Sequence, residues 1–236
     1  HEAPTAATAR LSETTCQNLR QAADRARSAV VWISTVRTED VVSVPPPADG
    51  ARTSASVGGG SGIAIGTGLV LTNEHVIRDA SSLVVELADG RRYCVEQSAI
   101  AARHDLAVLR IACSNLDPLP LSARPAGAQA GVVAVAGHHF PSSTQCRIGV
   151  IENTASNLQR QLDPSGRRDY RQLVQTSAEM QPGFSGGPLL DEAGRVIGIN
   201  VATVGSGEHA RGYAIALDDE TRTVMDDLCR RVQPLR

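Results

Sequence analysis

Residues 181–189 read QPGFSGGPL and place one serine, Ser185, between glycines on both sides. Glycines around a serine keep its hydroxyl accessible and leave nearby backbone N–H groups free to bind an oxyanion. This is the local chemistry of a serine nucleophile. The Gly-x-Ser-x-Gly spacing also fits the nucleophile elbow of α/β-hydrolases and ordinary hairpin turns, so residues elsewhere in the chain must decide between these alternatives.

A base and an acid both lie upstream of this serine. The apolar run at 69–73, LVLTN, leads to His75, where a strand would end and a turn or short helix begin. Asp105 opens a second apolar run, LAVLRI at 106–111. The chain order His75, Asp105, Ser185 is that of chymotrypsin-like proteases. An esterase on an α/β-hydrolase fold is disfavoured, because the 51 residues after Ser185 leave little room for its remaining strands, acid and histidine.

The chain as a whole resembles the trypsin-like protease domain of bacterial HtrA (Deg) proteins, over roughly residues 25–232. This resemblance implies an all-β fold of two six-stranded antiparallel β-barrels, chymotrypsin-like, with an N-terminal and a C-terminal helix. The motifs that carry it, in chain order, are GSGI at 60–63, TNEHV at 72–76, DLAVL at 105–109, GHHF at 137–140, GVI at 149–151, QTSA at 175–178, GIN at 198–200 and GYAI at 212–215.

The resemblance also implies a serine endopeptidase that works through an acyl-enzyme. Ser185 would attack the peptide carbonyl, His75 would act as general base, and Asp105 would hold the imidazole in the correct tautomer. The backbone N–H groups of Gly183 and Ser185 would form the oxyanion hole. No cofactor is expected. The alternative is a catalytically weak or inactive protease-like module that binds peptides, and Phe184 supports it best, since HtrA proteases usually have asparagine there.

The resemblance places the specificity pocket between two short segments. Glu179 and Met180 would form one wall, and Val201, Ala202 and Thr203 the other. Met180 suits the small aliphatic residues that HtrA-like enzymes usually prefer. Glu179 is either a buried anion that selects Arg or Lys, as in trypsin, or an outward, solvated side chain, and we favour the second. The strand that carries the second wall is expected to bind a polypeptide substrate as an added β-strand.

Composition agrees with this interpretation and excludes other classes of protein. The net charge is −2 and the arginines are scattered, so nucleic acid is not an expected partner. The chain has no lysine, which excludes Ser-Lys dyads, lysine Schiff bases and P-loops. No apolar run approaches the roughly 20 residues of a membrane helix, so membrane insertion is not expected.

Several expectations concern context and regulation. The chain begins at His1, as a mature or trimmed product would, and ends without the PDZ domains common in HtrA proteins. We expect an exported bacterial protein, periplasmic or secreted, that is a monomer or a trimer. No segment resembles the Ile-Val-Gly-Gly start of activated trypsins, so trypsin-type zymogen cleavage is not expected. The loops at 159–171 and 37–60 are the candidates for regulation instead.

The expected organisation is an N-terminal segment followed by one protease domain. Thr14 and Gln17 have the spacing of a capping box, and Asp218 and Asp219 can cap the last helix. The predicted ranges are an N-terminal segment at 1–29 with a helix over about 12–28, a protease domain at 30–236, a first strand at 30–36, a long loop at 37–60 and a C-terminal helix at 218–232.

The five cysteines are too widely spaced for a zinc ribbon or a redox Cys-x-x-Cys motif. They are either small buried thiols or disulfide partners, and export favours at least one bridge. The pairs weighed are Cys94 with Cys113 and Cys16 with Cys229; at least one cysteine must stay unpaired. His104, His138 and His139 lack the spacing of metal ligands, so no metal site is predicted, and His209 is expected to be a solvated loop residue.

Overall fold

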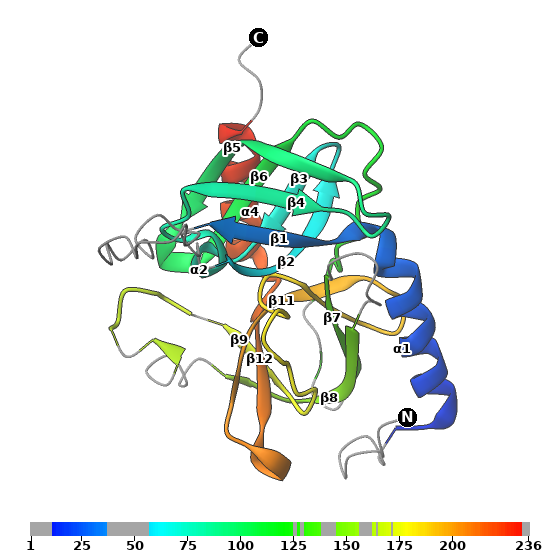
Figure 1. Ribbon diagram of the computed structural model, residues 1–236. Helices are drawn as coiled ribbons and strands as arrows, with labels where there is room; N and C mark the ends of the chain where they lie inside the picture. The colour runs from blue at the N-terminus through cyan, green and yellow to red at the C-terminus, as the bar shows by residue number, and fades with distance from the viewer. Residues whose placement is uncertain are drawn as a thin grey trace, which may run out of the picture.

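The computed structural model describes residues 11–36, 57–124, 127, 130–137, 145–155, 162–163, 165–170 and 172–232, and it forms two closed six-stranded antiparallel barrels (Figure 1). This confirms the predicted two-barrel architecture with a helix near each end. The first barrel has the strand order β1-β2-β3-β6-β5-β4. Its strands are β1 Val30–Val36, β2 Val57–Gly66, β3 Leu69–Thr72, β4 Ser82–Glu86, β5 Arg92–Ala101 and β6 Leu106–Ile111.

The second barrel repeats the topology of the first, with the order β10-β11-β12-β9-β8-β7. Written from β7, this order is β7-β8-β9-β12-β11-β10, so each strand of the second barrel corresponds to the strand of the first barrel whose number is lower by six. The sequence shows no repeat that would have predicted this. The strands are β7 Gly131–Ala136, β8 Gln145–Ala155, β9 Leu173–Thr176, β10 Pro188–Leu190, β11 Val196–Val204 and β12 Arg211–Ala216.

The terminal helices cover different barrels (Figure 1). Helix α1, Glu13–Ala26, packs on the second barrel against β7, which is therefore buried along its whole length. Helix α4, Asp219–Arg231, packs on the first barrel against β5 and β6. No helix among the described residues is long and apolar enough to cross a membrane.

Both helices begin at a side-chain cap. The Asp218 carboxylate accepts the Thr221 N–H at 2.8 Å and caps α4, close to the predicted start. At α1 the capping-box prediction was wrong, because the Ser12 hydroxyl accepts the Thr15 N–H instead, at 3.1 Å. Ser12 lies at the point where the chain leaves extended backbone, and only a residue there can reach the free N–H groups of the first turn.

All five cysteines lie among the described residues, and all are free thiols. The predicted bridges fail for geometric reasons. Cys94 is exposed on β5, whereas Cys113 is buried in the segment that follows β6, so the two thiols lie in different environments. Cys16 lies on α1 and Cys229 on α4, and these helices cover different barrels. Burial raises the pKa of the Cys146 and Cys229 thiols above the ordinary value, which keeps both in the unreactive protonated form.

Most of the predicted long loop at 37–60 lies outside the described residues. The prediction placed its end too late, because β2 already begins at Val57 and pairs with β1 from Val36 onward. The glycines at 58–60 read as loop residues in the sequence, yet they lie where a side chain would collide with a neighbour. A Cβ on Gly59 would come within 2.5 Å of the Ile33 carbonyl oxygen. Close packing of strands therefore selects these glycines.

Candidate active site

Helix α2, Glu74–Ile77, follows β3 directly and presents His75 at the edge of the first barrel. The Asp105 backbone carbonyl anchors the start of this helix, since it accepts the Glu74 N–H at 3.1 Å and the side-chain N–H of Asn73 at 3.0 Å. His75 is thereby placed against Asp105, its neighbour in space but thirty residues away in sequence.

The Asp105 carboxylate holds His75 through two hydrogen bonds. Oδ1 accepts the His75 backbone N–H at 2.9 Å, and Oδ2 lies 2.7 Å from the ring Nδ1. Asp105 is fully buried, and its backbone is left-handed, with φ 53° and ψ 39°. Asparagine and aspartate tolerate this conformation better than most residues. Because Nδ1 faces a carboxylate, it carries a proton, which leaves Nε2 as the free basic nitrogen.

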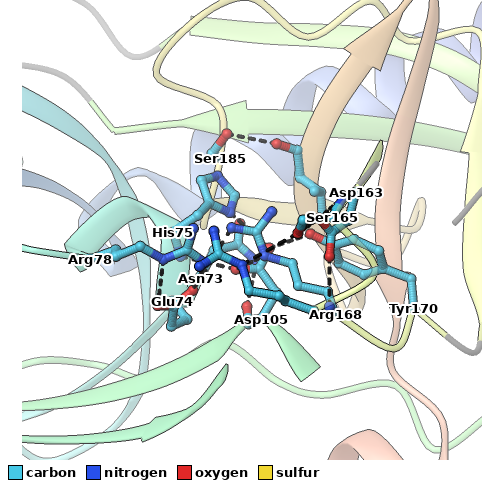
Figure 2. A network of polar contacts seen from close by, with 12 residues as sticks. Asn73, Glu74, His75, Arg78, Asp105, Asp163, Ser165, Arg168, Tyr170 and Ser185 are labelled. Atoms are coloured by element: carbon cyan, nitrogen blue, oxygen red, sulfur yellow. Dashed lines mark hydrogen bonds and ion pairs between the residues drawn. The ribbon is translucent and has the colours of Figure 1, made fainter. Parts of the chain in front are cut away.

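Ser185 comes from the second barrel, on the turn that leads into β10 (Figure 2). The His75 ring points toward it in Figure 2. The Ser185 hydroxyl itself donates to the Val201 carbonyl, with an oxygen–oxygen distance of 2.7 Å. That carbonyl is available because β11 has a bulge between Asn200 and Ala202, which takes Val201 out of the ladder with β12.

The turn before Ser185 shapes the predicted oxyanion hole. Phe184 N–H donates to the Gln181 carbonyl at 3.1 Å, with proline at 182 and Gly183 at φ 100°, the pattern of a type II turn. Residues with a side chain rarely adopt this φ, whereas glycine does so readily, so this turn requires Gly183. Among the hydrogen bonds of the described residues, neither the Gly183 N–H nor the Ser185 N–H is used as a donor. Both N–H groups therefore remain available to an oxyanion.

Ser61, on β2 of the first barrel, ties this turn in place. Its hydroxyl donates to the Gly183 carbonyl and accepts the Gly137 N–H at 2.8 Å. Its backbone N–H donates to the Ser185 carbonyl at 2.8 Å. Ser61 is fully buried, so loss of the hydroxyl would leave two buried polar groups without a partner. The first barrel thus orients the Gly183–Phe184 and Ser185–Gly186 peptide groups.

Phe184, the residue least expected from the family pattern, anchors the same turn. Its side chain is 1% exposed and belongs to the core of the second barrel, together with Ala134 on β7 and Leu189 on β10. Only the backbone at this position is needed for an oxyanion hole, so an apolar side chain that fixes the turn by burial is compatible with the predicted chemistry.

A pocket of about 390 Å³ opens beside Ser185. Four of the five predicted specificity residues line it, whereas Glu179 is exposed and is not part of its lining. The Thr203 side chain links the two walls of the pocket by two hydrogen bonds. Its hydroxyl accepts the Met180 N–H at 2.9 Å and donates to the Met180 carbonyl at 2.8 Å. The residues that line the pocket are Met180, Gln181, Pro182, Phe184, Ser185, Val201, Ala202, Thr203 and Gly205.

The sequence interpretation missed two residues that touch the acid. The Tyr170 hydroxyl donates to Asp105 Oδ2 at 2.7 Å, and Arg168 Nε forms an ion pair with Oδ1 at 3.5 Å. Burial, followed by the Asp105 carboxylate, raises the pKa of Tyr170 far above its ordinary value, so its hydroxyl stays protonated. Both residues lie in a polar, turn-rich stretch with no motif or period, and no sequence signal marks them.

Comparison with known proteins agrees with this geometry. Residues 60–199 match the family described as "Trypsin-like peptidase domain". The curated relatives include serine endoprotease DegS of Escherichia coli K12, 32% identical over 183 residues, which are 75% of this chain and 50% of DegS. The putative serine protease HhoA of Synechocystis is 37% identical over 180 residues, 74% of this chain and 43% of HhoA. The chain therefore spans half or less of the length of these relatives.

Solved structures show the same fold. The HtrA-type protease AlgW with a tripeptide superposes with a TM-score of 0.72 at 28% identity, covering 91% of this chain and 64% of that one. The Rv3671c protease in an inactive form superposes with a TM-score of 0.69, covering 92% and 96% of the two chains. Its 19% identity supports the fold alone. The fold is thus chymotrypsin-like, as predicted.

Proposed function

Because the chain belongs to the trypsin-like peptidase family, with HtrA/Deg serine proteases as its relatives, we propose that it is a serine endopeptidase that cleaves polypeptides. The observation that carries the proposal is the pair of His75 and buried Asp105, 2.7 Å apart, with the ring pointing toward Ser185. The proposed base and acid come from the first barrel and the proposed nucleophile from the second, and this convergence of three such side chains from distant segments supports a shared role.

The proposed mechanism starts with rotation of the Ser185 hydroxyl from the Val201 carbonyl to His75 Nε2. Such rearrangement is common, since catalytic hydrogen bonds often form only with substrate bound. His75 then takes the hydroxyl proton as Ser185 attacks the peptide carbonyl, and Asp105 stabilises the imidazolium. The N–H groups of Gly183 and Ser185 bind the oxyanion. His75 returns the proton to the leaving amine, and water hydrolyses the acyl-enzyme by the same steps.

The pocket supports selection of an aliphatic side chain at the residue before the scissile bond (P1). Met180, Val201 and Ala202 offer apolar surface, and none of the described residues that line the pocket is a carboxylate. Because the relative AlgW is a protease solved with a peptide, we extend peptide binding to this chain, with residues 201–203 of β11 pairing with the extended substrate. We also propose export from the bacterial cytoplasm, since relatives such as the DegP-like protein of Chlamydia muridarum are named as periplasmic.

The role of Glu179 can be measured directly. Glu179→Gln is expected to change the ratio of kcat/KM for P1 Val and P1 Arg peptides by less than about twofold, because an exposed carboxylate is screened by water. Peptides that differ only at P1 provide the measurement, with Glu192→Gln, another acidic residue away from the pocket, as the control. A tenfold loss of P1 Arg cleavage in Glu179→Gln alone would show that Glu179 reaches the bound side chain.

The decisive test of the proposed function is labelling with a fluorophosphonate, which phosphonylates only an activated serine. The folded protein is expected to be labelled at Ser185, which mass spectrometry of the modified peptide would show. Heat-unfolded protein is expected to remain unlabelled. Activation requires the base and the oxyanion donors together, so a folded structure is needed. If the folded protein resists the probe at high concentration, the peptide-binding module becomes the better account.

A further inference from the structure

The Asp105 carboxylate receives its partners symmetrically from the two barrels (Figure 2). Oδ1 accepts the His75 backbone N–H from the first barrel and faces Arg168 Nε from the second. Oδ2 faces His75 Nδ1 from the first barrel and accepts the Tyr170 hydroxyl from the second. Each oxygen therefore has one partner from each barrel. A fully buried carboxylate is costly unless such partners compensate its charge.

The segment that supplies these two partners is organised by its own carboxylate. Asp163 accepts the Ser165 N–H at 3.1 Å, the Ser165 hydroxyl and the Arg168 N–H at 2.6 Å. These hydrogen bonds lower the pKa of Asp163, the Ser165 hydroxyl contributing most, so the carboxylate stays ionised under ordinary conditions. The Asp169 N–H then donates to the Arg103 carbonyl, two residues before Asp105. The turn is thus fixed internally and fastened beside the acid.

Charge is also balanced across this contact. Arg168 lies between two buried carboxylates, since its Nη2 is 3.8 Å from Glu74 Oε2 while its Nε faces Asp105. Glu74 precedes His75 and also accepts Arg78 Nε at 2.8 Å. Among the described residues, Asp105 contacts the imidazole, and the charged groups linked to it in this network are Arg168, Glu74 and Arg78. Removal of Arg168 leaves the field of this network more negative.

We propose that Tyr170 and Arg168 are positioning residues of the triad, which hold the Asp105 carboxylate in the rotation that His75 requires and moderate its charge. The inference rests on the proposed protease function and deepens it. Neither residue is placed at the substrate or the reacting atoms, so both act through Asp105. A purely structural role, in which the contacts only fasten the 162–170 segment to the first barrel, would affect stability without altering the titration of the site.

Two variants test this in the full chain: Tyr170→Phe, which removes only the hydroxyl, and Arg168→Gln. Each is expected to lower kcat/KM about tenfold, because each removes a partner of a buried charge. Each should also move the acidic limb of the pH–rate profile upward, by about half to one pH unit. The sign follows from charge: with Asp105 less compensated, protonated His75 is favoured, so the neutral base is lost at higher pH. Arg168→Lys should restore much of the parent profile.

Matched controls separate these effects from general damage. Arg167→Gln removes the neighbouring exposed arginine of the same turn. Tyr93→Phe removes a tyrosine hydroxyl on the first barrel that accepts a hydrogen bond from Arg91. Both controls should keep the parent rate and pH profile. Thermal unfolding of all variants shows whether each one is folded at the assay temperature.

A readout independent of turnover separates failure of this inference from failure of the proposed function. The proton shared by His75 Nδ1 and Asp105 gives a far-downfield proton NMR signal, assigned by its loss in His75→Ala. In Tyr170→Phe and Arg168→Gln this signal is expected to shift and to titrate at higher pH than in the parent. The shift supports positioning even if the parent resists the fluorophosphonate. If the signal and its titration match the parent and both controls, the proposal is overturned whatever the activity.

Discussion

Replacement of Ser185 or His75 by alanine is expected to lower turnover of a peptide substrate by about a millionfold. The size of the effect follows from the way the two side chains act: His75 activates nothing without the serine, and the serine is a poor nucleophile without its base. The double variant should therefore lose no more than either single variant. Residual activity would come from the oxyanion donors Gly183 and Ser185, whose backbone N–H groups survive the substitutions.

The measurement is kcat with a fluorogenic peptide, together with the extent of fluorophosphonate labelling. Ser206→Ala and His209→Ala are matched controls, since both residues are exposed in the turn between β11 and β12. The controls should keep full activity. Substantial turnover by Ser185→Ala, or losses that multiply in the double variant, would mean that the two residues are not a nucleophile and its base.

Asp105→Asn is expected to lower kcat by about ten-thousandfold at neutral pH. Both carboxylate oxygens face donors from His75, the backbone N–H at Oδ1 and the ring Nδ1 at Oδ2. An asparagine must place its NH₂ group against one of them. The conflict is relieved when His75 Nδ1 gives up its proton, which moves the proton to Nε2 and leaves no base facing Ser185.

The substitution suits the local backbone, so the loss should be chemical and not a failure to fold. Asp105 has φ 53°, a conformation that asparagine tolerates well. Asp79, exposed and with φ 58°, is a matched control: Asp79→Asn should leave kcat and the unfolding temperature unchanged. Steady-state kinetics and thermal unfolding of both variants provide the test. A kcat for Asp105→Asn within tenfold of the parent would remove Asp105 from the triad.

Much of the fold could be predicted because its motifs are local. The apolar run before His75, the aspartate that opens the next strand and the glycines around Ser185 each mark the end or start of a strand within a few residues. The caps and apolar stripe of α4 predicted that helix to within a residue at each end. The two-barrel architecture was predicted from the family resemblance alone, because no repeat in the sequence marks the topology that the barrels share.

The errors and omissions have a common cause. The bridge between Cys94 and Cys113 appeared possible from spacing, but the fold leaves Cys94 exposed and buries Cys113 after the end of β6. Glu179 precedes a pocket residue, Met180, yet Glu179 is exposed and Met180 is buried, a difference that their adjacent places in the sequence do not indicate. Tyr170 reaches Asp105 across 65 residues of sequence, along a path between barrels that no local pattern describes.

By itself, the sequence indicated the two-barrel fold class, through its resemblance to a known family, and the three side chains proposed as base, acid and nucleophile, because motifs and their order are local properties of the chain. Only the tertiary structure decided how these side chains are held. The contacts of Tyr170 and Arg168 with Asp105, of Ser61 with Gly183 and of Ser185 with the Val201 carbonyl form between distant segments. The contacts of Asp105 and Ser61 exist because two closed barrels pack against each other, whereas the Ser185 contact forms within the second barrel. Both kinds of contact depend on the whole core rather than on any one motif.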